Sequence, residues 1–424
     1  MNPAQRRVAT PAPPRLRECP DCGQFQVVPE LPPATRAQCL RCDAVLRHTH
    51  SDPLWTPLAL NVTALLLFLI AAGSTLMLVS TAGQVHIADM FSGPIGLDRH
   101  GMWELAAVVL FTTIAAPAIK LCCMLYVLIG LRTARPPANI RTVFAWVEHL
   151  RPWSMIEVYL LGVFVAYVKL GDLVYIQVGV ALYALGALLL TMIAADAMLD
   201  AQFVWEEMER RGVARLPVEH VSVTAARSAN RMIGCDTCGL VSHPTANCPR
   251  CGFRLHDRKP DSLVRTWALG AAAAILYVPA NIYPVLTVVQ LGAGQPSTIL
   301  GGVRELLTGG QWPLAALVFF ASVMVPVLKL VGLTVLLTST QQRRVGRLRD
   351  RTRLYRIVDA IGRWSMIDIF MASLLVALVQ FGALVTIDPG TGAIAFAGVV
   401  ILTMFAARTF DPRLMWDAAA ARAR

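Results

Sequence analysis

Long stretches without charge alternate along the chain with polar stretches in which arginine is frequent. Eight of the apolar stretches approach or exceed the roughly 20 residues that a helix needs to cross the hydrocarbon core of a bilayer. They cover residues 54–79, 105–131, a segment starting near Trp153, 172–196, 265–290, 312–338, a segment starting near Trp364, and 388–408. Because only helices and closed barrels satisfy the backbone in lipid, we predict eight transmembrane helices.

The second half of the chain repeats the first at an offset of about 210 residues. Residues 151–157 read Arg-Pro-Trp-Ser-Met-Ile-Glu, and residues 362–368 read Gly-Arg-Trp-Ser-Met-Ile-Asp. A Pro-x-x-Lys sequence that ends at Lys120 in the second stretch recurs at Lys329 in the sixth. Each half holds four predicted spans, an even number, so both halves have the same orientation in the membrane.

The distribution of basic residues predicts that orientation. Of the 38 Lys and Arg residues, the loops on one side hold only Arg99, Lys169 and Arg304, while Lys120 and Lys329 lie inside helices. The remainder lies on the other side, which the positive-inside rule assigns to the cytoplasm. The net charge of +11 is therefore a topology signal and argues against nucleic acid as a partner. No secretory signal peptide is visible, so we expect both termini in the cytoplasm and the protein in the bacterial inner membrane.

Eight of the ten cysteines form four Cys-x2-Cys pairs, two before the first span and two before the fifth. The two sets are Cys19, Cys22, Cys39, Cys42 and Cys235, Cys238, Cys248, Cys251. Paired knuckles of this kind bring four thiolates onto one tetrahedral ion and are a strong signature of structural zinc. We predict two zinc ribbons. Disulfides are the alternative, which a reducing cytoplasm opposes, and rubredoxin-like iron also suits four thiolates.

These patterns divide the chain into five predicted parts. Residues 1–50 hold a disordered tail and the first ribbon, and residues 51–204 form the first four-helix module. A linker and the second ribbon occupy residues 205–262, the second four-helix module residues 263–410, and a tail residues 411–424. We expect both ribbons on the cytoplasmic side.

Polar side chains inside the spans are candidates for function, because an ionisable group in the bilayer core costs free energy. Lys329 lies well inside the sixth span, and Asp368 lies near the start of the seventh, on the same helix face as Ser365. Pro326 removes the backbone bond to the carbonyl of Ser322. The predicted transport network of the second half is Ser322, Lys329, Ser365, Asp368 and Thr403.

The first half offers equivalents of this network. They are Thr113, Lys120, Ser154 and Glu157. The alternative is a buried pair of lysine and acid that only holds helices together. For the first half both interpretations stay open, whereas for the second half we favour a network in which Lys329 and Asp368 change protonation or partner during transport.

The sequence argues against an enzyme. No hydrolase elbow, P-loop or His-Glu-x-x-His motif occurs, and the histidines do not cluster with acids. Cys122 and Cys123 lack partners at ligand spacing and are expected to be packing residues.

The order of ribbon, four spans, ribbon and four spans, with the twin Trp-Ser-Met-Ile motifs that end at Glu157 and Asp368, resembles the paraquat-inducible protein A family. The likeness extends over nearly the whole chain. The resemblance implies tetraspanin-like four-helix modules and an inner-membrane protein that works with an MCE-domain partner of the LetB or PqiB type. In that family the partner forms a periplasmic tunnel for lipids.

We therefore expect an α-helical polytopic membrane protein that loads or receives phospholipid for such a tunnel and supports outer-membrane integrity. Three other functions are alternatives: a membrane anchor for the tunnel without transport activity, a redox or stress sensor built on the cysteine sites, and a proton-coupled transporter of a small solute.

Overall fold

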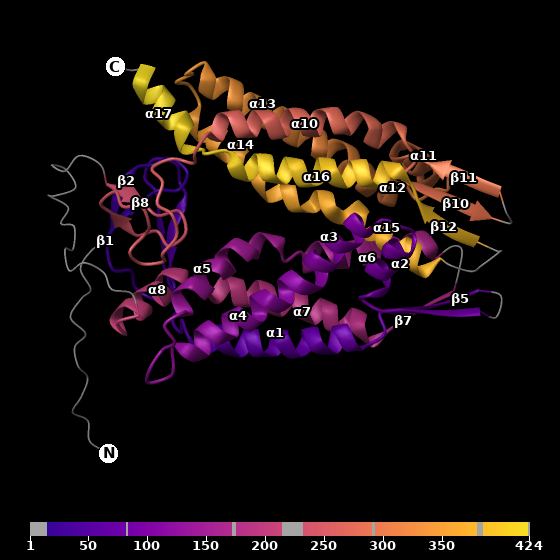
Figure 1. The fold of residues 1–424 in the computed structure, drawn as a ribbon, viewed down its shortest axis with the longest axis horizontal. Helices are drawn as coiled ribbons and strands as arrows, with labels where there is room; N and C mark the ends of the chain where they lie inside the picture. Colours follow the sequence, from indigo (N-terminus) through magenta and orange to yellow (C-terminus); the bar gives the residue numbers. More distant parts are fainter. Residues whose placement is uncertain are drawn as a thin grey trace.

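Eight long apolar helices dominate the part of the protein that the computed structural model describes, which is residues 15–81, 84–171, 175–213, 232–290, 293–379 and 385–422 (Figure 1). The helices are Trp55–Gly73, Trp103–Gly130, Ile140–Lys169, Val180–Met198, Ser262–Ile282, Trp312–Gln341, Leu348–Leu378 and Thr391–Thr409. The predicted polytopic helical fold with eight spans is confirmed. The N-terminal tail predicted to be disordered lies outside the described residues up to position 14.

The first module runs from one end of the molecule to the other four times. Its elements are α1 (Trp55–Gly73), β5 (Met77–Thr81), β6 (Gln84–Ala88), α2 (Ser92–Arg99), α3 (Trp103–Leu110), η1 (Phe111–Ala115), α4 (Ala116–Gly130), α5 (Ile140–Leu150), η2 (Arg151–Trp153), α6 (Ile156–Leu170), β7 (Tyr175–Val178) and α7 (Val180–Met198). Helix α8 (Ala201–Arg210) follows, so the predicted boundary at residue 204 falls inside a helix.

The second module repeats this order of elements. They are α10 (Ser262–Ile282), β10 (Leu286–Gln290), β11 (Ala293–Ser297), α11 (Ile299–Thr308), α12 (Trp312–Phe319), η3 (Phe320–Met324), α13 (Val325–Gln341), α14 (Leu348–Ile361), η4 (Gly362–Met366), α15 (Ile367–Leu378), β12 (Val385–Pro389) and α16 (Thr391–Thr409). Helix α17 (Arg413–Arg422) lies in the predicted C-terminal tail and corresponds to α8. The prediction of two tandem repeats is confirmed.

A small antiparallel sheet caps each module at one end, called the strand end here (Figure 1). The strand orders are β6-β5-β7 and β11-β10-β12. Leu78 faces Ile87 on one side and Gln177 on the other, and Val288 faces Gln295 and Ile387. The predicted ends of the first and fifth spans, at residues 79 and 290, were therefore wrong. Apolar strands follow these helices directly, and hydropathy cannot separate a helix from an apolar strand that continues it.

The second and sixth spans each contain one widened turn. The π-helical turns η1 and η3 lie 209 positions apart, and a proline follows each of them, Pro117 and Pro326. Val325 N donates to Phe320 O, five residues back. Because the next residue is proline and has no N–H, the helix accommodates the missing bond by widening one turn instead of kinking freely.

The Trp-Ser-Met-Ile motifs form the breaks in the third and seventh spans. These spans begin with the amphipathic helices α5 and α14, and the 3-10 turns η2 and η4 separate them from α6 and α15. The candidate span Leu348–Leu378 includes α14, and Asp368 lies in the first turn of α15. The charged side chains of α14 kept this helix out of the apolar stretch from which the seventh span was predicted.

Two small ribbons lie side by side at the opposite end, the ribbon end (Figure 1). The first contains β1 (Arg15–Glu18) paired with β2 (Phe25–Val28), and β3 (Arg36–Gln38) paired with β4 (Val45–His48). The second contains β8 (Ile233–Gly234) paired with β9 (Val241–Ser242). Gly234 N donates to Glu18 Oε2 at 2.8 Å, so the ribbons contact each other directly.

Each ribbon packs its apolar side against the module that it does not precede in the sequence. The cysteines of the first ribbon cluster with Leu336 of α13 and Trp416 of α17. The cysteines of the second ribbon cluster with Phe144 of α5 and Trp205 of α8, and Phe253 stacks on His149. This crossed arrangement links the two modules at the ribbon end.

The modules also meet inside the apolar region, through α15. On one side Gly162 of α6 lies against Phe370, and a side-chain carbon built on this glycine would be 3.0 Å from the Phe370 Cβ. On another side Gly96 of α2 lies against Ala377. Two glycines in the first module thus let its helices approach α15 closely.

Candidate functional site

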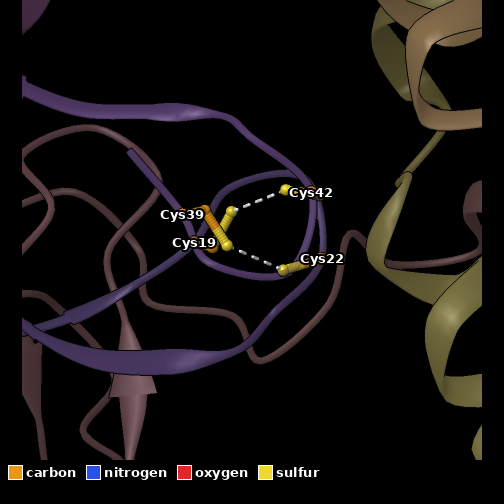
Figure 2. A group of neighbouring side chains, drawn as sticks. All are labelled: Cys19, Cys22, Cys39 and Cys42. Carbon is orange, nitrogen blue, oxygen red and sulfur yellow. Dashed lines mark hydrogen bonds between the residues drawn. The ribbon is translucent and has the colours of Figure 1, made fainter. Parts of the chain in front are cut away.

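The eight predicted ligand cysteines form two buried clusters, each with its four sulfurs within 4.8 Å of one another. In the first, Cys19 and Cys42 lie 3.5 Å apart, and Cys22 and Cys39 lie 3.6 Å apart (Figure 2). Four thiolates at about 2.3 Å from a tetrahedral ion would be about 3.8 Å apart, so this arrangement fits a metal ion. All ten cysteines are free, which excludes the disulfide alternative here.

The same local turn builds all four knuckles. In the first, Gly23 N donates to Cys19 O at 2.9 Å with Gly23 in the left-handed region, φ 69°. Gly239 and Gly252 repeat this conformation, and Asp43 takes it at φ 60° in the knuckle that lacks a glycine. Asp is one of the few residues with a side chain that enter this region at low cost, so the fourth knuckle forms without glycine.

Side chains from outside the knuckles support the first cluster. Gln26 Nε2 donates to Cys39 Sγ at 2.8 Å. From α14, Arg356 donates to the carbonyl of Cys42 at 2.9 Å and pairs with Asp21 at 2.7 Å. Donors around ligating thiolates orient them and reduce their negative charge, so the second module contributes to the metal site of the first ribbon.

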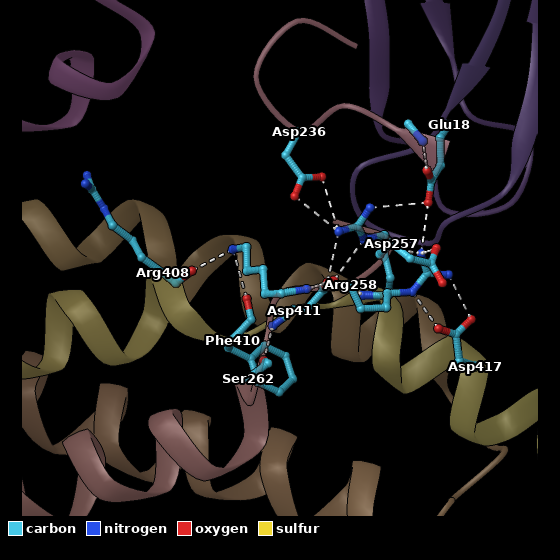
Figure 3. A network of polar contacts seen from close by, with 12 residues as sticks. Glu18, Asp236, Asp257, Arg258, Ser262, Arg408, Phe410, Asp411 and Asp417 are labelled. Carbon is cyan, nitrogen blue, oxygen red and sulfur yellow. Dashed lines mark hydrogen bonds and ion pairs between the residues drawn. The ribbon is translucent and has the colours of Figure 1, made fainter. Parts of the chain in front are cut away.

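A network of ion pairs, called the clasp here, ties both ribbons to the second module (Figure 3). Arg413 of α17 pairs with Glu18 at 3.3 Å, with Asp236 at 3.2 Å and with Asp411 at 3.0 Å. Arg258 bridges Asp417 and Glu18 at 2.7 and 3.1 Å. The clasp therefore joins the start of the described chain, the second ribbon and the last helix.

Polar contacts also tie the first ribbon to α8. Arg47 pairs with Glu206 at 3.0 Å, and Arg15 pairs with Glu209 at 2.9 Å. Arg250 of the second ribbon reaches the same Glu209. Helix α8 thus occupies a position in the first module like that of α17 in the second.

Electrostatics within the clasp follow from its burial and from Arg413. Burial would raise the pKa of Asp411, but the hydrogen bonds and charge of Arg413 outweigh it and hold that pKa below its ordinary value. Burial raises the pKa of Glu18 and Asp236 more than Arg413 lowers it. For Arg413, burial favours a lower pKa, yet the carboxylates around it raise the pKa above its ordinary value.

In the second module, the structure brings two of the five predicted network residues into a direct hydrogen bond. Lys329 Nζ donates to Thr403 Oγ1 at 2.7 Å, and the lysine is 1% exposed. Among the described residues, no carboxylate forms an ion pair with Lys329, and no direct contact joins it to Asp368. The ammonium group has one neutral hydrogen-bond partner and is attracted by the carboxylate of Asp359 without an ion pair.

The other three residues of this network contact one another less directly. Both carboxylate oxygens of Asp368 and the Ser365 hydroxyl are buried without a hydrogen-bond partner among the described residues. The Ser322 side chain approaches Asp368, but its hydroxyl donates to Val318 O at 2.6 Å. Buried polar atoms in this condition require a proton, a ligand or water as partner.

In the first module, Lys120 has a partner of opposite charge. Its Nζ lies 2.8 Å from Asp196 Oδ2, and Arg151 lies 3.8 Å from the same carboxylate. Lys120 therefore forms an ion pair with Asp196, a residue that the predicted group of equivalents did not include. Thr113 donates to Val109 O at 2.7 Å, and the Ser154 hydroxyl is buried without a partner among the described residues.

A cavity of about 1890 Å³ lies between the modules, and its lining includes Lys120, Ser154 and Glu157. None of the five network residues of the second module belongs to this lining. The structure thus places three of the four predicted residues of the first module at the cavity, whereas Thr113 and the predicted network of the second module lie outside its lining.

Sequence reasoning missed Asp196 and the clasp. Asp196 had served only as the boundary of the fourth span, although it is a charged residue that closes an apolar helix. The repeat could have pointed to one residue of the clasp, because Asp411 lies 211 positions after Asp200. Asp200 accepts from Gln202 N and Phe203 N at the start of α8, and Asp411 accepts from Arg413 N at 3.0 Å.

Comparisons with known proteins agree with the repeat and the fold. The profile of the family described as "Paraquat-inducible protein A" matches twice, at residues 54–209 and 263–420. The chain is 34% identical over 403 residues to "Intermembrane transport protein PqiA" of Escherichia coli (strain K12), with 94% of this chain and 95% of the relative covered. No solved structure matches.

Two further relatives cover nearly the same length. "Lipophilic envelope-spanning tunnel protein A" of Escherichia coli (strain K12) is 31% identical over 404 residues, with 95% of this chain and 91% of the relative covered. "Probable intermembrane transport protein" of Haemophilus influenzae is 26% identical over 418 residues, with 96% and 97% covered. The match over both halves, together with the two four-helix modules, shows that the chain belongs to the paraquat-inducible protein A family.

Proposed function

We propose that the protein is the inner-membrane component of an MCE-type intermembrane lipid transport system. It loads phospholipid into, or receives it from, a periplasmic tunnel partner of the LetB or PqiB type that docks at the strand end. The names of the relatives, which refer to intermembrane transport and an envelope-spanning tunnel, support this proposal. In this function the ribbon end, with its arginine-rich loops, is cytoplasmic, and the chain acts without catalysing a covalent reaction.

The observation that carries the proposal is that two ionisable residues of the second module are buried without an ion pair among the described residues. Lys329 donates one hydrogen bond, to a threonine hydroxyl, and the Asp368 carboxylate accepts none from the described residues, although both residues lie within candidate membrane spans. Ionisable groups in that condition mark substrate paths and proton relays. A lysine beside hydroxyls binds phosphate, so Lys329, Thr403, Ser322, Ser365 and Asp368 form the site that contacts the lipid headgroup.

The experiment that tests this proposal measures phospholipid movement between the two membranes in cells that carry the tunnel partner. Asp368→Asn and Lys329→Ala are expected to abolish it at normal protein levels. Thr334→Val, a change on the exposed face of the same helix α13 as Lys329, is the control and keeps transport. Full transport by both network variants would favour the anchor function and refute this site.

The two cysteine clusters are proposed to hold structural zinc, one ion each. Four buried thiolates leave no open coordination position, so the metal supplies folding energy and no chemistry. Native mass spectrometry of the purified chain is expected to show two zinc ions, whereas iron would give visible absorbance and support the sensor alternative.

A further inference from the structure

The cavity between the modules has the dimensions of a lipid site. Its volume of about 1890 Å³ exceeds the roughly 300–1,000 Å³ of pockets for small molecules. It is lined along α7 from Leu182 to Asp196, which corresponds to about 21 Å at 1.5 Å per residue. That length covers one leaflet of the hydrocarbon core and the adjoining headgroup layer.

Polarity changes along the cavity in one direction. Near the ribbon end its lining includes Asp236, Lys259 and Arg408, while the α6 and α7 walls towards the strand end consist of side chains such as Leu160, Phe164 and Leu182. On α6 the only charged lining residue is Glu157, in the first turn, and on α7 it is Asp196, in the last turn. The cavity is therefore polar at the ribbon end and apolar towards the strand end.

The apolar part opens to the side, towards the region that lipid occupies. Tyr183 and Phe164 line the cavity and are nevertheless 72% and 56% exposed. A ligand with long acyl chains can therefore enter laterally from the leaflet at the ribbon end, without crossing the protein.

The polar end carries both signs of charge in nearly equal number. Four basic residues line it: Lys120, Arg151, Lys259 and Arg408. Five acidic residues line it: Glu148, Glu157, Asp196, Asp236 and Asp359. A headgroup with one negative and one positive charge meets complementary groups of both signs here.

One donor in this lining lacks a partner. The Ser154 hydroxyl is buried in a residue that is 4% exposed, and it makes no hydrogen bond within the described part of the chain. It follows Arg151 by three positions at the break between α5 and α6. A hydroxyl and a guanidinium at this break are suitable partners for one phosphate group.

We propose that this cavity binds one zwitterionic glycerophospholipid, with its phosphate near Arg151 and Ser154 and its ammonium group among the carboxylates. The site is distinct from the buried network of the second module, and it rests on the proposed function in taking phospholipid as the substrate. It would hold a lipid from the ribbon-end leaflet before the lipid reaches Lys329 and Asp368.

Two glycines allow a matched test. A side-chain carbon built on Gly186, which lines the cavity, has no neighbour within 4 Å, and the same holds for Gly270 on α10, which does not line it. The full-length protein is reconstituted in nanodiscs with equimolar phosphatidylethanolamine and phosphatidylglycerol, extracted in mild detergent, and its retained lipid is measured by mass spectrometry. Both variants, Gly186→Trp and Gly270→Trp, are expected to fold.

We expect the wild type and Gly270→Trp to retain phosphatidylethanolamine preferentially, and Gly186→Trp to retain about tenfold less of it. Ser154→Ala loses one donor to a charged group, which corresponds to roughly tenfold weaker retention. Equal retention by both tryptophan variants, or retained lipid with the composition of the nanodisc, would identify annular lipid only and overturn the site.

Failure of this inference can be told from failure of the proposed function. Asp368 lies outside the cavity, so Asp368→Asn is expected to lose transport, while adding Gly186→Trp to it should still lower the retained phosphatidylethanolamine about tenfold. Normal transport by Asp368→Asn would refute the function of the buried network and leave the cavity result unaffected.

Discussion

Glu18 and Arg413, which lie 395 positions apart in the chain, form an ion pair at 3.3 Å in which both side chains are almost fully buried. Arg413 belongs to the last helix of the second module, and Glu18 belongs to the ribbon that precedes the first module. The pair therefore fixes the crossed arrangement of the ribbons. Each module carries at its ribbon end a domain that the chain connects to the other module.

Replacing Arg413 with methionine is expected to loosen the clasp strongly. Glu18, Asp236 and Asp411 would lose their shared partner, and breaking a buried pair from one side costs roughly 3–5 kcal/mol. Hydrogen exchange should accelerate in β1 and α17. Arg265→Met is the control, because Arg265 and Asp261 form an exposed pair at 3.9 Å that contributes little. Equal exchange in both variants would show that the clasp adds no stability.

Loss of one metal site is expected to affect the module that the ribbon packs against, which is not the module that follows this ribbon in the chain. In Cys19→Ser with Cys22→Ser, exchange should accelerate in α14, because Arg349 and Arg356 of α14 bond to the first ribbon. In Cys235→Ser with Cys238→Ser, it should accelerate in α5, where Phe253 stacks on His149 at 4.9 Å.

The control for the metal sites is Cys122→Ser with Cys123→Ser, since these two cysteines belong to neither cluster. It should keep two metal ions by native mass spectrometry and leave exchange in both helices unchanged. If each ribbon variant instead accelerated exchange in the other of these two helices, α5 for the first ribbon and α14 for the second, the crossed packing would be wrong.

The spans and knuckles follow from local sequence, and the sequence therefore predicts them well. Apolar length defines a transmembrane helix, and a Cys-x2-Cys spacing defines a turn, without reference to the rest of the chain. The strands Met77–Thr81 and Leu286–Gln290 were missed because they are apolar and follow helices directly. The crossed ribbons were missed because order along the chain does not determine which module a ribbon contacts.

The partners of the buried residues could not be predicted, because they depend on tertiary packing. The repeat suggested that Lys120 and Lys329 would have the same environment, but the position that corresponds to Asp196 is Ala407. One lysine therefore forms an ion pair, whereas the other, within the described residues, forms a hydrogen bond to Thr403 and no ion pair. The difference between Asp196 and Ala407 indicates that the two lysines have different surroundings, but only the structure shows which residues contact them.

The two lysines are expected to respond differently to replacement by methionine. Lys120→Met removes a partner of Asp196 and should destabilise the protein by about 1–3 kcal/mol. Lys329→Met removes a buried charge that forms no ion pair among the described residues, so stability should stay equal or rise while transport is lost. Thermal unfolding and transport are measured on both. A loss of stability in Lys329→Met as large as in Lys120→Met would indicate a structural role for Lys329.

Contact between the modules at Gly162 is expected to control the position of α15 and hence of Asp368. A Cβ at this position lies 3.0 Å from the Phe370 Cβ and 3.3 Å from the backbone nitrogen of Met371, so Gly162→Ala forces α6 and α15 apart. Crowding of this kind costs typically 1–3 kcal/mol. Gly270→Ala makes the same chemical change on α10 with no neighbour within 4 Å and outside the cavity lining, so it isolates the crowding from the effect of alanine on the helix. Gly162→Ala should lower both the unfolding temperature and transport relative to Gly270→Ala. Equal unfolding temperature and equal transport in the two variants would contradict this prediction. The close packing of Gly162 against Phe370 would then have no role in transport.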